Sequence, residues 1–107
     1  MHLVIFITVG SHDDAVKLAR ALIKEKMAAC ANIVGGVDSI FWWEGKVEEA
    51  KEHLLIVKSV DYMLDGITKR VKELHSYANP EIIAVKVAGG SGDYLDWVAS
   101  NVQPKQE

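Results

Sequence analysis

Residues 30–59 read CANIVGGVDSIFWWEGKVEEAKEHLLIVKS, and this stretch decides the fold. It contains two apolar segments typical of strands, one from Cys30 to Trp43 and one from Val47 to about Ser59. Between them, Glu44-Gly45-Lys46 predicts a tight turn, because glycine adopts a positive φ without steric cost. The adjacent glycines Gly35-Gly36 indicate a bulge or a bend in the first strand. The stretch therefore predicts a β-hairpin that is unusually long for a chain of 107 residues.

A strand followed by an amphipathic helix occurs twice, once before the hairpin and once from its second strand onward. The first unit has the apolar run 3–9, and its helix begins at Ser11, approximates a capping box with Asp14 and ends near Met27. In the second unit the apolar run LLIV (54–57) leads to a helix with Asp61 as its expected N-cap. The apolar stripe of this helix is Leu64, Ile67, Val71 and Leu74.

The last third of the chain adds one strand and one short helix. Pro80 prevents continuation of the second helix, a strand follows at Ile82–Val87, and the loop GGSG (89–92) opens the last helix. We expect the tail after Asn101 to be frayed. The order β-α-β-β-α-β plus a C-terminal helix predicts an α+β, ferredoxin-like fold in a single domain over residues 1–107. Right-handed crossovers then place both main helices on one face of one sheet.

Composition and charge exclude several classes of protein. The formal net charge is −3, with 12 basic and 15 acidic residues, so we expect no nucleic-acid partner. The longest apolar run is far shorter than the roughly 20 residues that span a bilayer, and no basic residue precedes it as in a signal peptide. The single cysteine, Cys30, has no internal disulfide partner. We therefore expect a cytoplasmic protein with no membrane partner.

The strands are apolar on both faces, which predicts self-association. The segments LVIFITV (3–9), SIFWW (39–43) and LLIV (54–57) are apolar at successive positions. With both helices on one face, the other face should carry polar residues at alternate positions. Either short central strands are covered by loops, or the second face meets another subunit, because otherwise a large apolar surface is exposed. Trp42 and Trp43 point to opposite faces and favour an interface.

No residue set predicts a catalytic site. An enzyme of the acylphosphatase type would need an arginine after the first strand, where this chain has VGSHDD. The loop GGSG lacks the lysine and the spacing of a phosphate-binding loop and is interpreted as a connector. None of the four histidines lies in a metal-binding motif, and we expect His2, His12 and His53 at the surface or at an interface.

Two features could bind a ligand or simply be structural. Cys30, on an apolar strand edge, is interpreted as a packed or interfacial residue or as a soft-metal ligand, with a nucleophile least favoured. Charged residues around the hairpin turn form either a solvated edge, a patch of oxygen ligands for a hard cation or a salt-bridge seam between subunits. These residues are Glu44, Lys46, Glu48, Glu49 and Glu52, with Glu44 and Glu48 on one strand face under ideal alternation.

Taken together, these segments resemble the CutA family, the divalent-cation tolerance proteins. The matching residues are LARALIKEKMAACANI (18–33), SIFWWEGKVEE (39–49), HLLIVKS (53–59), RVKELHSY (70–77), NPEIIAV (79–85) and GDYLDWV (92–98). They cover essentially the whole chain in the right order. The resemblance implies a ferredoxin-like subunit in a tight trimer similar to the PII signalling proteins, with an association with metal tolerance and copper binding.

The resemblance also implies a polar cleft between subunits. Its residues at matching positions are Cys30, Glu44, Lys46, Lys58, His75, Tyr77 and Glu81. The family commonly reads H-P-Y-E-x-P-E-I where this chain has HSYANPEI, so Ser76 replaces a proline and Ala78 replaces a carboxylate. Losing the proline makes the loop less rigid, and losing the carboxylate removes a hard metal ligand.

The leading hypothesis is a cytoplasmic homotrimer, not an enzyme, that binds a divalent metal, copper first, in this cleft. Imidazole suits copper and thiolate suits Cu(I), so His75 and Cys30 are the expected ligands, with Glu81 and Glu44 as oxygen donors. Lys46, Lys58, Tyr77, Trp42 and Trp43 would line the cleft, and no organic cofactor is expected. The alternative is a PII-like regulatory or scaffold trimer that binds a small anion or a protein partner, with Lys46 and Lys58 facing the ligand.

Overall fold

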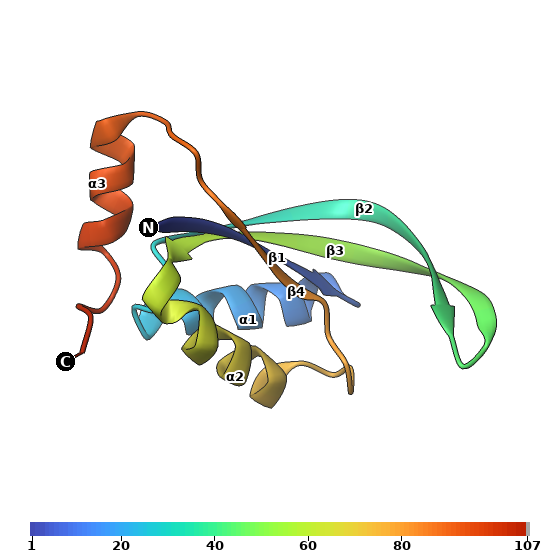
Figure 1. Ribbon diagram of the computed structural model, residues 1–107. Helices are drawn as coiled ribbons and strands as arrows, with labels where there is room; N and C mark the ends of the chain where they lie inside the picture. Colours follow the sequence, from blue (N-terminus) through green and yellow to red (C-terminus); the bar gives the residue numbers. More distant parts are fainter. Residues whose placement is uncertain (107) are drawn as a thin grey trace.

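The computed structural model describes residues 1–106 and confirms the α+β, ferredoxin-like order of elements (Figure 1). The strands β1 (His2–Val9), β2 (Cys30–Trp43), β3 (Lys46–Val60) and β4 (Ile82–Lys86) form one antiparallel sheet in the order β2-β3-β1-β4. The helices α1 (His12–Lys24) and α2 (Leu64–Leu74) cover one face of this sheet, as predicted. The short helix α3 (Gly92–Ser100) lies near the start of β1.

The core lies between the sheet and these two helices. Along β1 every second side chain is buried, and Ile5 and Ile7 point toward the helices with no exposed surface. Leu22 of α1 and Ile67 of α2 cover them and are themselves fully buried. The Ser11 hydroxyl caps α1 by accepting a hydrogen bond from the backbone N–H of Asp14 at 3.2 Å, as the sequence indicates. Among the described residues, each helix is too short or too polar to cross a bilayer.

The long hairpin is present, with the predicted turn and bulge. Glu44 and Gly45 have positive φ angles of 50° and 78°. Two successive positive φ angles are typical of the two-residue hairpin turn whose twist matches that of the flanking strands. The β2–β3 register shifts between Val34 and Val37, where Gly36 has a φ of 73°. The tip of the hairpin extends past the ends of β1 and β4 and past the two helices that cover the sheet (Figure 1).

Apart from the end near the start of β1, where α3 packs, residues 1–106 leave the face of the sheet opposite α1 and α2 uncovered, and we call it the open face. Ile83 and Val85 of β4, which pair with Phe6 and Val4 of β1, are large apolar residues exposed on it. The hairpin tip, which extends past the helices, is exposed as well, and there the exposed fraction reaches 75% for Trp42. The apolar pattern on both sides of the strands therefore corresponds to a surface that this chain alone does not bury.

Helix ends differ from the sequence prediction in two places. Helix α1 ends at Lys24 rather than near Met27. Lys26 adopts a φ of 56°, and the N–H groups of Met27 and Ala28 both donate hydrogen bonds to the Leu22 carbonyl, which closes the helix. Asp61 is not the N-cap of α2. It begins a 3₁₀ turn (Asp61–Met63) that precedes the helix, and its carboxylate accepts from the Tyr62 N–H and the N-terminal ammonium.

The segment after Asn101 is not frayed where it leaves α3. Val102 is buried in the core, and the Gln103 N–H donates to the Lys26 carbonyl at 2.8 Å. The Gln103 side chain donates to the Glu25 carbonyl at 2.6 Å. These bonds tie Val102 and Gln103 to the turn that ends α1, so the expectation of a frayed tail after Asn101 was wrong for these two residues. Residues 104–106 are exposed, and Glu107 lies outside the described residues.

Candidate functional site

A group of polar side chains lies on the open face where β2 begins. The β2–β3 register places Cys30 directly opposite Lys58, and the Lys58 ammonium lies 4.0 Å from the Cys30 sulfur. The same ammonium donates a hydrogen bond to the side-chain oxygen of Asn32, which the Cys30 thiol approaches at 3.9 Å. Burial of its phenol, and then the neighbouring Cys30 thiol, raise the pKa of Tyr94. Sulfur, amide oxygen and ammonium groups therefore meet at one point of the sheet.

The bulge in β2 determines this pairing. Counting back from the turn with no bulge would place Ser59 opposite Cys30, whereas the register shift places Lys58 there. A slip of one residue moves a side chain to the other face of a strand. Ser59 accordingly points into the core and donates to the Met27 carbonyl at 2.7 Å, and Lys58 points to the open face.

A small hollow of about 250 Å³ lies next to Lys58, between the start of β1 and α3. The loop Gly89–Ser91 forms part of its wall, together with His2, Tyr94 and Leu95. Ser91 is the N-cap of α3, and its hydroxyl accepts from the Tyr94 N–H at 3.4 Å. The Nε2 atom of His2 lies 2.7 Å from the Leu95 carbonyl oxygen, and because a carbonyl only accepts, this nitrogen carries the proton and donates.

A second polar group lies where α2 ends. The backbone N–H of Tyr77 donates to His75 Nδ1 at 3.0 Å, so the proton of the neutral ring is on Nε2, which donates to the Thr8 carbonyl at 2.7 Å. The Tyr77 hydroxyl donates to the Glu52 carboxylate at 3.0 Å. Burial, followed by this carboxylate, raises the pKa of Tyr77. Both ring nitrogens of His75 are thus engaged in bonds that hold the loop after α2.

Glu52 is the residue of this group that sequence reasoning missed. The sequence indicates only a charged residue near the hairpin turn, in a solvated edge, a patch of oxygen ligands or a seam between subunits, whereas the folded residue is only 6% exposed. The bulge and the ring of Tyr77, 25 residues away in the sequence, enclose it. The alternation of Glu44 with Glu48 was also wrong, because Glu44 lies in the turn itself and not on a strand.

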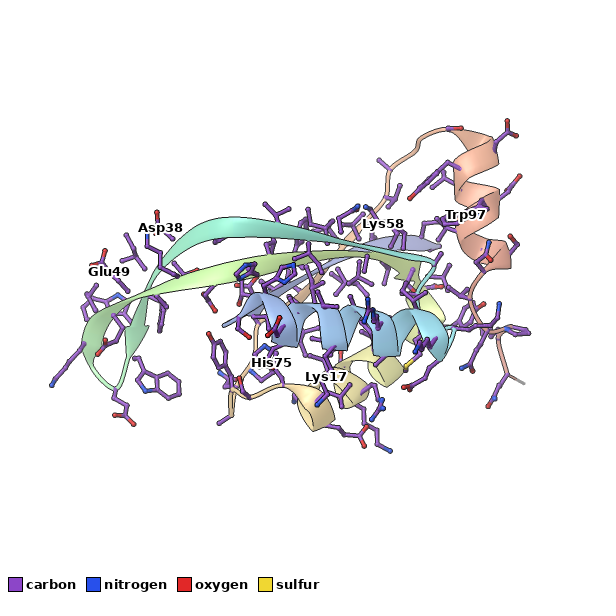
Figure 2. The ribbon with its side chains drawn as sticks, turned by 180° about the vertical axis from the view of Figure 1, so that it is seen from behind. Lys17, Asp38, Glu49, Lys58, His75 and Trp97 are labelled. Carbon is purple, nitrogen blue, oxygen red and sulfur yellow. The ribbon has the colours of Figure 1, made fainter. Side chains whose placement is uncertain are left out.

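One chain does not bring the predicted metal ligands together. Cys30 lies opposite Lys58 and His75 contacts Thr8, whose strand partner is Leu54. Four residues of β3 therefore separate the two sites, roughly 13 Å along the strand. Figure 2 shows Lys58 and His75 on opposite sides of the sheet. Glu44 is at the exposed hairpin tip, Glu81 is exposed just before β4, and no three potential ligands gather within residues 1–106.

The remaining residues predicted to line the cleft lie on the hairpin or beside it. Lys46 begins β3 opposite Trp43, and Trp42 is the most exposed of the large apolar residues. Trp42, Trp43 and Lys46 are therefore at the tip, close to Glu44, while Lys58 is beside Cys30 and Tyr77 is beside His75. The predicted cleft residues thus form three separate groups in a single chain.

Comparison with known proteins identifies the family. The model of the family described as CutA1 divalent ion tolerance protein matches residues 3–101. The solved structure of the divalent cation tolerance protein (Cut A1) from Thermus thermophilus has a TM-score of 0.95 and 45% sequence identity. The match covers 96% of this chain and 100% of that chain.

Two plant relatives are similar in sequence. "Protein CutA 1, chloroplastic" from Oryza sativa subsp. japonica is 43% identical over 101 residues, which are 94% of this chain and 57% of the rice protein. "Protein CutA, chloroplastic" from Arabidopsis thaliana is 41% identical over 101 residues, 94% of this chain and 56% of its own length. The chain spans a little more than half the length of these two relatives. It belongs to the family of CutA1 divalent ion tolerance proteins.

Proposed function

We propose that this chain forms a cytoplasmic homotrimer that binds a divalent cation, copper first, in a cleft between subunits and so contributes to metal tolerance. The family to which the chain belongs is described by tolerance of divalent ions. The observation that carries the proposal is the placement of Cys30, Asn32 and Lys58 on an open apolar face that a single chain leaves uncovered. In this proposal the protein binds metal without catalysing a reaction.

The open face and the exposed hairpin tip support assembly of several copies of the chain. Trp42, Ile40 and Ile83 are more than half exposed, and fully burying a large apolar side chain contributes about 1.5–3 kcal/mol. The hairpin extends past its own sheet, so its tip has room to meet a neighbour. The outer strands β2 and β4 present unpaired edges, which another strand can join. Three copies arranged as in the PII proteins would cover these surfaces.

The polar groups support metal binding at the junction between copies. Thiolate sulfur suits Cu(I), and Cys30 is partly accessible on the open face. His75, Glu81 and Glu44 are too far from Cys30 in one chain, so a neighbouring copy supplies them in the proposed cleft. His75 becomes a ligand only by giving up its bond to the Tyr77 N–H or to the Thr8 carbonyl. Cys30 is therefore the first ligand of the proposed site, and Lys46, Lys58, Tyr77, Trp42 and Trp43 line it.

The test is a competition titration of metal-free protein with Cu(I), and a separate one with Cu(II), on the unmodified chain and on Cys30→Ser. We expect Cys30→Ser to weaken Cu(I) binding about tenfold or more, by analogy with the loss of groups that support a metal site. His75→Ala tests the divalent ion in the Cu(II) titration, where we expect weaker binding than in the unmodified chain, because imidazole suits copper and thiolate suits Cu(I). Identical isotherms for the unmodified chain and Cys30→Ser would contradict the cleft site. Analytical ultracentrifugation of both variants checks that assembly is unchanged.

A second candidate function is a PII-like regulatory or scaffold trimer that binds a small anion or a protein partner. The observation that favours it is the Lys58 ammonium at the wall of the 250 Å³ hollow, next to the loop Gly89–Ser91. A thermal-shift panel separates the two candidates, because a ligand stabilises the fold that binds it. Stabilisation by nucleotides or carboxylates, with no effect of metal ions, would favour the regulatory function.

A further inference from the structure

We propose that His12 and His53 form a second metal site, contained within one chain, that binds a divalent transition metal such as Zn(II) through two imidazoles. This site shares no residue with the proposed cleft. The four histidines divide into two classes by their contacts. His75 uses both ring nitrogens, and His2 uses Nε2 on the Leu95 carbonyl. Neither His12 nor His53 has a ring hydrogen bond to any of residues 1–106, and their two rings meet in an edge-to-face arrangement.

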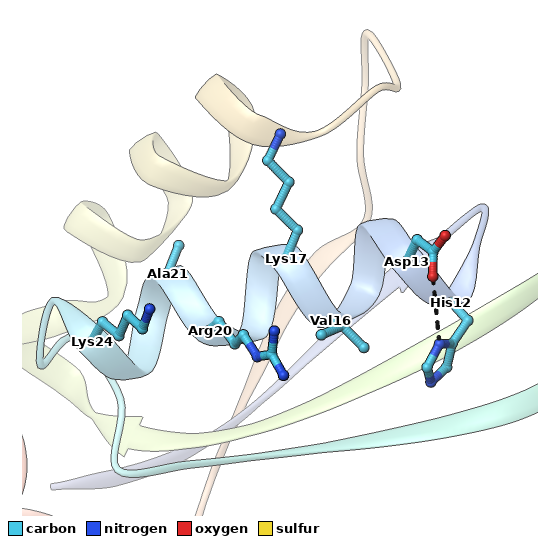
Figure 3. A pocket seen from close by; sticks show the side chains of 7 residues that line it. All are labelled: His12, Asp13, Val16, Lys17, Arg20, Ala21 and Lys24. Carbon is cyan, nitrogen blue, oxygen red and sulfur yellow. Dashed lines mark ion pairs between the residues drawn. The ribbon is translucent and has the colours of Figure 1, made fainter.

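The fold brings these two rings together from a helix and a strand. Helix α1 begins at His12, whose ring extends from the helix toward the strands (Figure 3). His53 lies on β3 opposite Val9, the last residue of β1, on the face of the sheet that carries the helices. Gly35, next to the bulge in β2, lies beside His53, because a Cβ at this position would be in ordinary van der Waals contact with the His53 ring at 3.5 Å. The pair therefore lies where the start of α1, the end of β1 and the bulge of β2 come together.

The separation of the rings fits a shared metal ion. Their centroids are 5.7 Å apart, with an angle of 64° between the ring planes. A Zn–N bond of about 2.0–2.1 Å places each ring centroid about 3.2 Å from the metal. Two imidazoles on one ion then have centroids about 5.2 Å apart in tetrahedral geometry and at most about 6.4 Å apart when they are opposite. The observed separation lies between these limits, so the two rings are close enough to share one metal ion.

An unsatisfied atom in the pair also indicates a missing ligand. His53 Nδ1 is buried and has no hydrogen-bond partner among residues 1–106. Buried polar atoms in native proteins nearly always have partners, and an exception calls for an unseen water or ion. His12 is the accessible member, with its side chain 65% exposed and Nδ1 4.0 Å from the Asp13 carboxylate.

The charges around the pair are mixed, which predicts a modest affinity. Asp13 and Asp14 in the first turn of α1 offset the positive end of the helix dipole. Lys17 and Arg20 lie further along the same shallow groove and oppose a cation (Figure 3). Because no third ligand of the histidine, cysteine or carboxylate type completes a cluster within the described chain, water fills the remaining positions. The ion is therefore exchangeable rather than permanently held.

The experiment is a Zn(II) titration of the assembled protein by calorimetry, carried out in a Cys30→Ser background that removes the cleft sulfur. We expect one Zn(II) per chain, and a dissociation constant about tenfold or more higher in His12→Ala. His2→Ala is the matched control and should leave this binding unchanged. In NMR spectra, the Hε1 signals of His12 and His53 should move together as Zn(II) is added.

His12→Ala is the decisive variant because its side chain is exposed and its removal does not open the core. Equal Zn(II) binding by the Cys30→Ser protein with and without His12→Ala would overturn the proposal, as would a shift of only one of the two Hε1 signals. Either result leaves the cleft site to be judged by its own Cys30 experiment. Conversely, failure of the cleft titration does not affect this test, which contains no Cys30.

Discussion

Replacing Tyr77 by phenylalanine removes one hydroxyl and keeps the ring that packs beside His75 and Gly10. The hydroxyl is the donor to Glu52, whose side chain is only 6% exposed. A hydrogen bond to a charged group contributes about 1.5–3 kcal/mol, and a buried acceptor that loses it has little access to water as a substitute. We therefore expect Tyr77→Phe to lower the free energy of unfolding by about 2 kcal/mol per chain.

The assay is guanidinium unfolding at a fixed protein concentration, because assembly makes apparent stability depend on concentration. Tyr62→Phe is the matched control, since it removes a hydroxyl that donates to the Gln103 carbonyl at an exposed position. The double variant Tyr77→Phe/Glu52→Gln should show a coupling of about 1 kcal/mol or more between the two sites. A loss in Tyr77→Phe no larger than that in Tyr62→Phe would refute the assignment of a buried Glu52–Tyr77 bond.

Three further predictions concern the turn, the core and the N-terminus. Gly45→Ala places a side chain at a φ of 78° and should cost about 1–2 kcal/mol in guanidinium unfolding; no change would contradict the turn. Ile67→Ala should cost about 2–5 kcal/mol in the same assay, because Ile67 is fully buried, and a smaller loss would contradict its core position. The N-terminal ammonium, through its hydrogen bond and its charge, holds the pKa of Asp61 below 3.8. This pair stabilises the fold above the ordinary pKa and is lost as pH falls through the lowered one, so N-terminal acetylation should raise the Asp61 pKa in NMR titration.

The sequence predicted those parts of the fold that depend on neighbouring residues. The apolar periods determine the strands and helices, and glycines at positive φ determine the turn and the bulge. The apolar residues on both strand faces correctly indicated a face that the helices leave uncovered. Each of these features has its cause within a few residues.

Features that depend on distant contacts were not predictable in this way. The segment at Val102 and Gln103 is ordered by the turn after α1, nearly 80 residues earlier in the sequence. That turn uses a positive φ at Lys26, a residue type that does not indicate such a conformation. Glu52 is buried only because the loop after α2 returns to it.

In the candidate site, too, the residue types could be predicted from the sequence, whereas their contacts with distant residues could not. Family resemblance indicated Cys30 and Lys58 as cleft residues. Their direct pairing depends on a register shift of one residue, and the sequence Gly35-Gly36 indicates a bulge without giving the size of the shift. The resemblance indicated His75 as a metal ligand. In the single chain both of its ring nitrogens form hydrogen bonds, one with the Thr8 carbonyl and one with the Tyr77 N–H. The His12–His53 pair joins a helix start to a strand 41 residues away and follows no sequence motif.

The central claim is that the open face and the exposed hairpin tip are covered by other copies of this chain. Sedimentation equilibrium at micromolar concentration measures the mass of the assembly directly, without assumptions about its shape. The account predicts three times the 11.8 kDa mass of one chain, and dissociation when Trp42 and Ile83 are both replaced by aspartate. A stable, folded species of 11.8 kDa would contradict it and remove the proposed cleft.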